Sequence, residues 1–128
     1  MNTISSILQF IANLMVTPTL SSTGISAYSS RVKNISGGQF KIGKWRYIQL
    51  RMTANQTFGI YGYNTVITGF DAPSGNYASL SASIAGYDSS SPISAYINSS
   101  GYVVMTNGGR EIQENWIIVI SGWYIANS

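Results

Sequence analysis

The stretch ISAYINSSGYVVMT, residues 93–106, decides the fold class. Apolar and polar residues alternate over residues 93–98, and the turn Ser99-Ser100-Gly101 separates this run from a second apolar run, residues 102–106. This is the pattern of two antiparallel strands joined by a tight reversal. The run Asn107-Gly108-Gly109 follows at once, and glycine adopts positive φ without a Cβ clash, so we predict another reversal there. This part of the chain therefore predicts consecutive β-strands.

The same period of two continues on both sides of this hairpin. In residues 44–54, Ile48, Leu50 and Met52 point one way, which predicts a core face and an opposite face that is aromatic and polar. Residues 115–126 begin with apolar side chains on both faces, which is typical of a central strand. The predicted strands are residues 25–33, 39–42, 44–54, 57–61, 64–70, 76–85, 93–98, 102–106 and 115–126.

Turn-forming residues punctuate the chain after residue 25, and no stretch there has a convincing helical period. A length of 128 residues corresponds to one domain. We therefore predict an all-β fold, a jelly-roll-like β-sandwich of about eight or nine antiparallel strands with a short N-terminal α-helix.

The first residues of the chain have helical spacing instead. The apolar positions with this spacing are Ile4, Ile7, Ile11 and Leu14. They recur at intervals of three, four and three, as the a and d positions of two heptads do. Isoleucine at both the a and the d positions of a coiled coil favours trimers and tetramers over dimers. We predict a helical trimerisation segment in residues 1–17, a linker in 18–24 and the sandwich in 25–128. Docking of the helix on its own sandwich stays open as the alternative.

This N-terminal segment lacks the marks of a targeting signal. No Lys or Arg precedes Arg31, so the basic region of a secretory signal is missing. Polar residues interrupt the apolar run before it reaches the roughly 20 residues that a membrane span needs. We therefore predict no membrane insertion.

Composition excludes several kinds of chemistry. Histidine and cysteine are absent, which removes the commonest general base, the commonest metal ligand and every thiolate site. The carboxylates are Asp71, Asp88, Glu111 and Glu114. Asp71 precedes a predicted turn that it can cap, and the two glutamates lie in one loop beside Arg110. We predict that the protein is not an enzyme and needs neither a metal nor a cofactor.

Charged residues make up only 9% of the chain, so the predicted surface is neutral and polar. The net charge is +3, and six of the seven basic residues lie within residues 31–51. This density is too low to predict a nucleic-acid site.

Four stretches together resemble a known family. They are GKWRYIQLRMTA (43–54), TGFDAPSGNYASLSASIAGY (68–87), ISAYINSSGYVVMTNGG (93–109) and IIVISGWYIANS (117–128). With the preceding helical segment, they resemble the C-terminal head domains of bacteriophage tail fibre and baseplate receptor-binding proteins. The resemblance implies a homotrimer on an extracellular virion tail or baseplate, attached to other virion proteins and binding a host cell-wall or surface saccharide. It carries over no individual ligand-binding residue, because these heads share no fixed binding motif.

Two turn-rich segments have the residues that saccharides require, namely aromatic faces for the sugar ring and polar groups for its hydroxyls. The candidate ligand-binding residues are Tyr61, Tyr63, Asn64, Tyr87 and Asp88. The alternative is that these are ordinary strand ends whose tyrosines cover the sheet.

The tryptophans Trp45, Trp116 and Trp123 lie within strands beside apolar runs, and we predict that they belong to the core or to a subunit interface. A cleft between subunits near Trp45, Tyr47 or Tyr96 is the second predicted location for binding. The alternative function is a structural virion component, such as a head fibre, decoration or baseplate protein, that binds no ligand.

Overall fold

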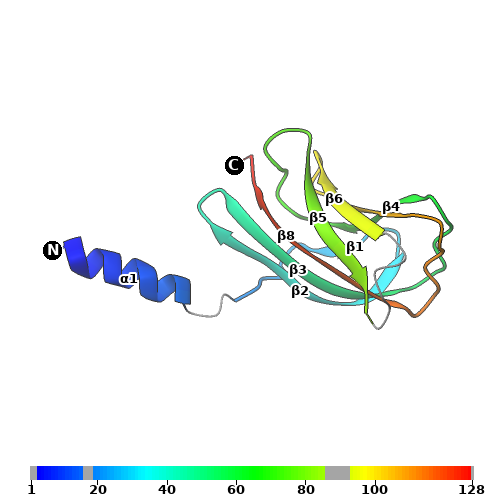
Figure 1. Cartoon of the computed structure of the whole chain (residues 1–128), viewed down its shortest axis with the longest axis horizontal. Helices are drawn as coiled ribbons and strands as arrows, with labels where there is room; N and C mark the ends of the chain where they lie inside the picture. Colours follow the sequence, from blue (N-terminus) through cyan, green and yellow to red (C-terminus); the bar gives the residue numbers. More distant parts are fainter. Residues whose placement is uncertain (1–2, 16–18, 86–92, 128) are drawn as a thin grey trace.

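In the part of the chain that the structure describes, one helix is followed by eight antiparallel strands (Figure 1). The computed structural model describes residues 3–15, 19–85 and 93–127, with the backbone alone for 10–15. The elements are α1 (Thr3–Met15), β1 (Ser26–Ala27), β2 (Val32–Ile42), β3 (Trp45–Ala54), β4 (Tyr63–Thr68), β5 (Tyr77–Ile84), β6 (Ile93–Asn98), β7 (Val103–Asn107) and β8 (Ile117–Ile125). The predicted fold class, an all-β sandwich-like domain with a short N-terminal helix, is confirmed.

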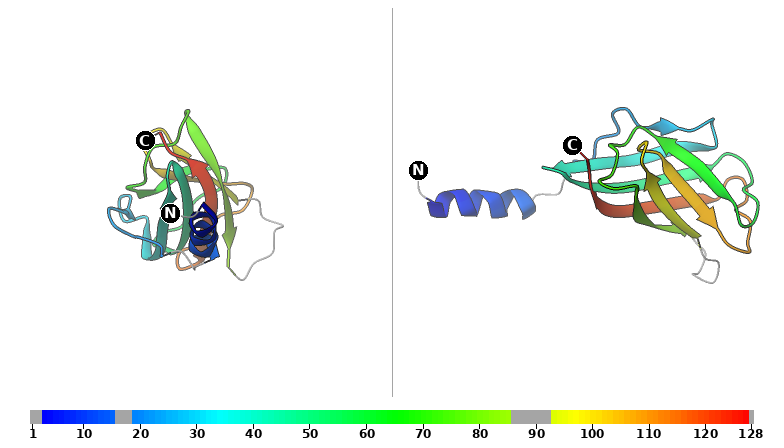
Figure 2. Two further views of the ribbon diagram at one scale, coloured as in Figure 1. Left: turned by 90° about the vertical axis from the view of Figure 1, so that its left-hand side faces the viewer. Right: turned by 90° about the horizontal axis from the view of Figure 1, so that it is seen from above.

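The strands form one nearly closed sheet in the order β1-β4-β7-β6-β5-β8-β3-β2. Strand β5 belongs to both halves of it, because residues 77–80 pair with β6 and residues 81–84 pair with β8. The sheet therefore turns over along β5 into two layers with the core between them (Figure 2). Strand β8 lies between β5 and β3, which confirms the prediction of a central strand.

The core consists of the side chains that alternate inward along these strands. Ile48, Leu50 and Met52 of β3 are buried, and Gln49 and Arg51 between them are exposed, as the period of two predicts. Apolar residues of β4, β6, β7 and β8 complete the same cluster.

Three predicted strands differ from the structure. Residues 25–33 do not form one strand, because Ser29 and Ser30 adopt φ of 50° and 55° and separate β1 from β2. Strand β2 also begins earlier than residue 39 and has a register shift between Lys33 and Ser36. Residues 57–61 make only an isolated bridge, between Phe58 and Ile112.

The predicted helix is confirmed as α1, and it lies beyond the end of the domain where the β2–β3 hairpin turns (Figures 1 and 2). Ile4 and Ile7 of its apolar stripe are 64% and 53% exposed. None of the α1 residues whose side chains are described belongs to the core. The side chains of Ile11 and Leu14 lie outside the described part, so trimerisation through the full stripe stays a prediction.

In the three described ranges, no helix has the length and apolar character needed to cross a membrane.

An ion pair closes the core at the end near α1. Arg46 continues the inward face of β3, is only 5% exposed, and donates from Nε to Asp71 Oδ2 at 2.7 Å. Lys41 Nζ lies 3.3 Å from the same oxygen. The Tyr124 hydroxyl donates to the Asp71 carbonyl at 2.9 Å, and burial raises the pKa of Tyr124 to about 12, so this donor stays protonated.

These groups predict how stability depends on pH. The Arg46 guanidinium holds the pKa of Asp71 below its ordinary value of 3.8. A carboxyl with a lowered folded pKa stabilises the fold above its unfolded pKa, and this contribution disappears as the pH falls through the folded pKa. We expect a constant free energy of unfolding from about pH 5 to about pH 8, where no histidine titrates, and a decline below about pH 4. Urea unfolding at a series of pH values measures this free energy. A steep change near neutral pH would contradict the prediction.

Candidate functional site

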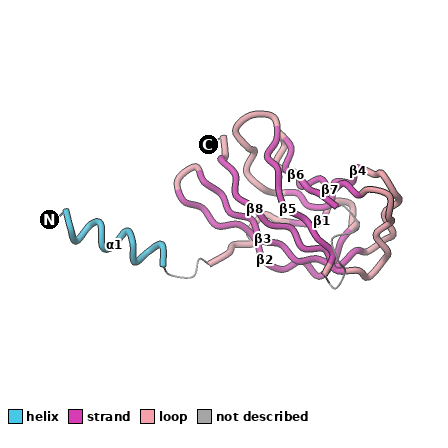
Figure 3. The backbone as a smooth tube through the Cα atoms, in the orientation of Figure 1, coloured by secondary structure: helices cyan, strands magenta, loops and turns pink. Residues whose placement is uncertain are grey.

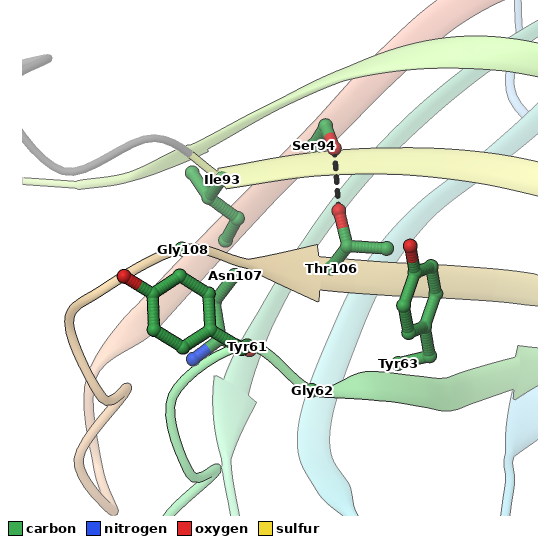
Figure 4. A pocket seen from close by; sticks show the side chains of 8 residues that line it. All are labelled: Tyr61, Gly62, Tyr63, Ile93, Ser94, Thr106, Asn107 and Gly108. Atoms are coloured by element: carbon green, nitrogen blue, oxygen red, sulfur yellow. Dashed lines mark hydrogen bonds between the residues drawn. The ribbon is translucent and has the colours of Figure 1, made fainter.

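A pocket of about 360 Å³ opens where β4 begins and β7 ends (Figure 4). The loops that flank it, residues 55–62 and 108–116, lie at the end of the domain opposite α1 (Figure 3). Its lining residues are Tyr61, Gly62, Tyr63, Ile93, Ser94, Thr106, Asn107 and Gly108. We call this the distal pocket.

Tyr61 lies on one side of the distal pocket in a strained conformation. Its side chain is 73% exposed, and its φ of 54° lies in the left-handed region that bulky residues rarely adopt. Its backbone N–H donates to the Gly108 carbonyl at 3.0 Å. A Cβ added at Gly109 would lie 3.2 Å from the Tyr61 hydroxyl. The absence of a side chain at Gly109 thus leaves room for the Tyr61 ring. The positive φ predicted at Gly108 and Gly109 is wrong.

Tyr63 is the first residue of β4 and pairs with Thr106 of β7. Its ring is 77% exposed. The Thr106 hydroxyl is hydrogen-bonded to the Ser94 hydroxyl of β6, and Figure 4 shows this pair between the Tyr61 and Tyr63 rings. The pocket therefore presents two aromatic rings with a strip of hydroxyl groups between them.

Asn107 holds the two loops together. It is only 6% exposed, and its Nδ2 donates to the Gly59 carbonyl at 2.8 Å and to the Arg110 carbonyl at 3.0 Å. Its Oδ1 is buried and has no hydrogen-bond partner among the described groups. The amide thus fixes the loop that precedes Tyr61 against the loop that follows β7.

Asn107→Ala is expected to lower the free energy of unfolding by about 1 to 2 kcal/mol, because two buried carbonyls lose their donor. Asn55→Ala is the matched control: that exposed amide donates to Ser30 O, and its loss is expected to cost about 0.5 kcal/mol. Chemical denaturation of both variants provides the comparison. Equal losses would contradict a special role for Asn107.

Only part of the predicted site is brought together. Tyr61 and Tyr63 line the same pocket, whereas Asn64 is half-buried beside Gly62 and is not among the lining residues. Tyr87 and Asp88 lie outside the described residues.

Sequence reasoning missed Ser94, Thr106 and Asn107 as lining residues. Their strands are separated along the chain, and no local motif marks them. The one local signal is an amide directly after an apolar strand and before two glycines, and this pattern is equally typical of an ordinary turn.

Two of the three tryptophans occupy the surface, whereas Trp116 packs against the core. Trp45 and Trp123 are each 51% exposed on the outer face of the β2-β3-β8 layer. Trp116 is half-buried, with the Arg110 guanidinium 5.2 Å from its ring centroid. Core placement is therefore wrong for Trp45 and Trp123, and an interface remains the open part of that prediction.

The distal pocket offers ring stacking and neutral hydrogen bonding, because its lining side chains are aromatic, aliphatic, hydroxyl and amide. Among the described residues, no group of three His, Cys, Asp or Glu is arranged to hold a metal ion.

Comparison with protein-family models, with curated proteins and with solved structures finds no significant match to this chain.

Proposed function

We propose that the chain is a saccharide-binding head domain of the kind found in phage tail fibres and baseplates, which binds a host-surface saccharide as an extracellular homotrimer. The observation that carries the proposal is the pair of exposed tyrosines beside a strip of hydroxyl groups in the distal pocket. The sequence resemblance supports the proposed biological setting, and the geometry of the pocket supports the proposed class of ligand.

A neutral sugar suits this chemistry. Its apolar ring face stacks on an aromatic side chain, and its hydroxyls exchange hydrogen bonds with hydroxyl and amide groups. The pocket volume of about 360 Å³ lies at the small end of the range for ligand sites, which suits a terminal sugar residue or a short fragment.

The position of the pocket supports the proposal as well. The loops that flank the distal pocket, residues 55–62 and 108–116, lie at the end of the molecule opposite α1 (Figure 1). A parallel bundle of α1 helices would present three pockets away from the stem, toward a target surface.

The backbone of Tyr61 is a further support. Glycine or asparagine would adopt φ of 54° with less strain, so the tyrosine ring is kept there at the expense of stability. Strained residues of this type cluster at ligand-binding and catalytic sites.

A glycan array with the purified full chain tests the proposed function. We expect saturable binding to a defined set of saccharides, and Tyr63→Ala should weaken the monovalent affinity about tenfold, corresponding to about 1 to 2 kcal/mol for one stacked ring. Tyr102→Ala is the matched control, because Tyr102 is exposed but lies outside the distal pocket. Absence of saturable binding would instead support the structural virion component.

Tyr61→Gly separates binding from stability. We expect affinity for the saccharide to fall about tenfold. The free energy of unfolding should change by less than about 0.5 kcal/mol, because relief of left-handed strain offsets the greater backbone freedom of glycine. Calorimetric titration and thermal unfolding measure the two effects. In the control Ser83→Gly, at an exposed position within β5, stability should fall while affinity stays unchanged. The reverse pattern would contradict a ligand-binding role for Tyr61.

A further inference from the structure

The outer face of the β2-β3-β8 layer carries six apolar or aromatic side chains side by side. We call this set the outer patch: Phe40, Ile42, Trp45, Tyr47, Trp123 and Ile125. The strand register produces it, because Phe40 and Trp123 both flank Tyr47, and Ile42 and Ile125 both flank Trp45. The outer face of an antiparallel sheet is ordinarily polar, and a contiguous apolar patch marks an interaction surface.

The rings of the outer patch do not form a flat platform. The Trp45 and Trp123 rings are 6.5 Å apart with an interplanar angle of 78°. The Tyr47 and Trp123 rings are 4.9 Å apart and tilted by 44°. Tilted aromatic rings flanked by isoleucines are typical of the centre of a protein interface, where aromatic side chains are enriched and charged ones are depleted.

The N-terminal segment reaches the domain on this same face. Leu20 lines a hollow with outward-facing residues of β3 and β8, among them Gln49 and Val119. Ser21 exchanges two backbone hydrogen bonds with Gln39, the residue before Phe40 of the outer patch. Ile42 and Trp45 of the outer patch are the last paired residues before the turn of the β2–β3 hairpin. This turn points toward α1 (Figures 1 and 2). Association of α1 helices in parallel would therefore place the outer patch of each copy close to the neighbouring copy.

The helix alone is too small to hold three copies. α1 has 13 residues, or fewer than four turns, and helices of this length are marginal in water. A stable interface buries roughly 800 Å² on each partner, more than one short stripe provides. The outer patch supplies exposed apolar surface at the same end of the molecule.

We propose that the outer patch is a contact surface between copies of this chain, continuous with the α1 bundle. In a threefold assembly the contact is heterologous, so each patch covers a different surface of the next copy. This inference rests on the homotrimer of the proposed function and is independent of saccharide binding.

A dilution series followed by analytical ultracentrifugation tests it on the full chain. Trp45→Lys with Trp123→Lys should raise the dissociation constant of the assembly at least about 100-fold, because charges replace buried rings. The control pair Ile60→Lys and Tyr77→Lys adds the same charge at exposed apolar positions outside the outer patch, and should change that constant less than about threefold. Equal effects of the two pairs would overturn the inference.

A second measurement needs no change in the patch. In a Trp116→Phe background, fluorescence reports only Trp45 and Trp123. We expect their accessibility to acrylamide to rise as dilution dissociates the assembly. Unchanged accessibility, or a wild-type chain that is monomeric throughout, would overturn the inference. A monomer that still bound saccharide would leave the distal pocket intact as a binding site.

Discussion

The double substitution Ile4→Asp and Ile7→Asp is expected to convert associated copies into single chains of 13.8 kDa. Both residues are exposed in the single chain and occupy the a and d positions of the α1 stripe, so a bundle would bury them. Carboxylates buried without partners cost several kcal/mol, which exceeds what a short helix and one patch can offset. Light scattering measures the mass, and circular dichroism should show an unchanged β-sheet domain.

Loss of assembly should reduce adsorption to host cells more than any other measured property. In the proposed homotrimer, three linked sites would bind through avidity, which adds about 10²- to 10⁴-fold to the affinity of one site. Adsorption to host cells should fall by about that factor, whereas binding of a monovalent sugar should not change. Ser5→Asp with Gln9→Asp is the matched control, since it adds the same charge off the stripe. An unchanged mass for the isoleucine variant would contradict helix-driven assembly.

Asp71→Asn is expected to give the second-largest effect, a loss of about 2 kcal/mol in the free energy of unfolding. The substitution leaves the Arg46 guanidinium, 5% exposed, without its carboxylate partner and still close to Lys41. The full cost of breaking a buried pair is reduced here, because one third of the Asp71 side chain is exposed. The melting temperature should fall by roughly 6 to 10 °C.

Glu111→Gln is the control for Asp71→Asn, because it removes one exposed carboxylate and should change stability by less than about 0.5 kcal/mol. Replacing both partners, as Arg46→Met with Asp71→Asn, should restore much of the loss. The decline in stability below about pH 4 should also become shallower in Asp71→Asn. A double variant as unstable as the sum of the single variants would contradict direct coupling.

Elements with one buried face could be predicted from the sequence. The alternation of Ile48, Leu50 and Met52 placed the inward face of β3 correctly, because a register slip would expose every one of them. Local irregularities could not be predicted in this way. Ser29 and Ser30 adopt positive φ, and the register shift in β2 depends on pairing with β3.

The candidate site could be predicted only where its residues are close together in the sequence. Tyr61 and Tyr63 stand among glycines in one loop, so their exposure could be predicted, whereas Ser94 and Thr106 reach them through strand pairing. The Arg46 and Asp71 pair was hidden for the same reason, since 25 residues separate its members. The outer patch likewise appears only when the registers of three strands are combined.

The central claim is that a saccharide binds in the distal pocket, and a nuclear magnetic resonance titration tests it most directly. The isotope-labelled full chain is titrated with the best saccharide from the array. Chemical-shift changes should be largest at residues 61–63, 93–94 and 106–108 and should weaken in Tyr61→Gly. Saturable shifts centred on the outer patch, or no shifts at concentrations that saturate the array, would contradict the claim.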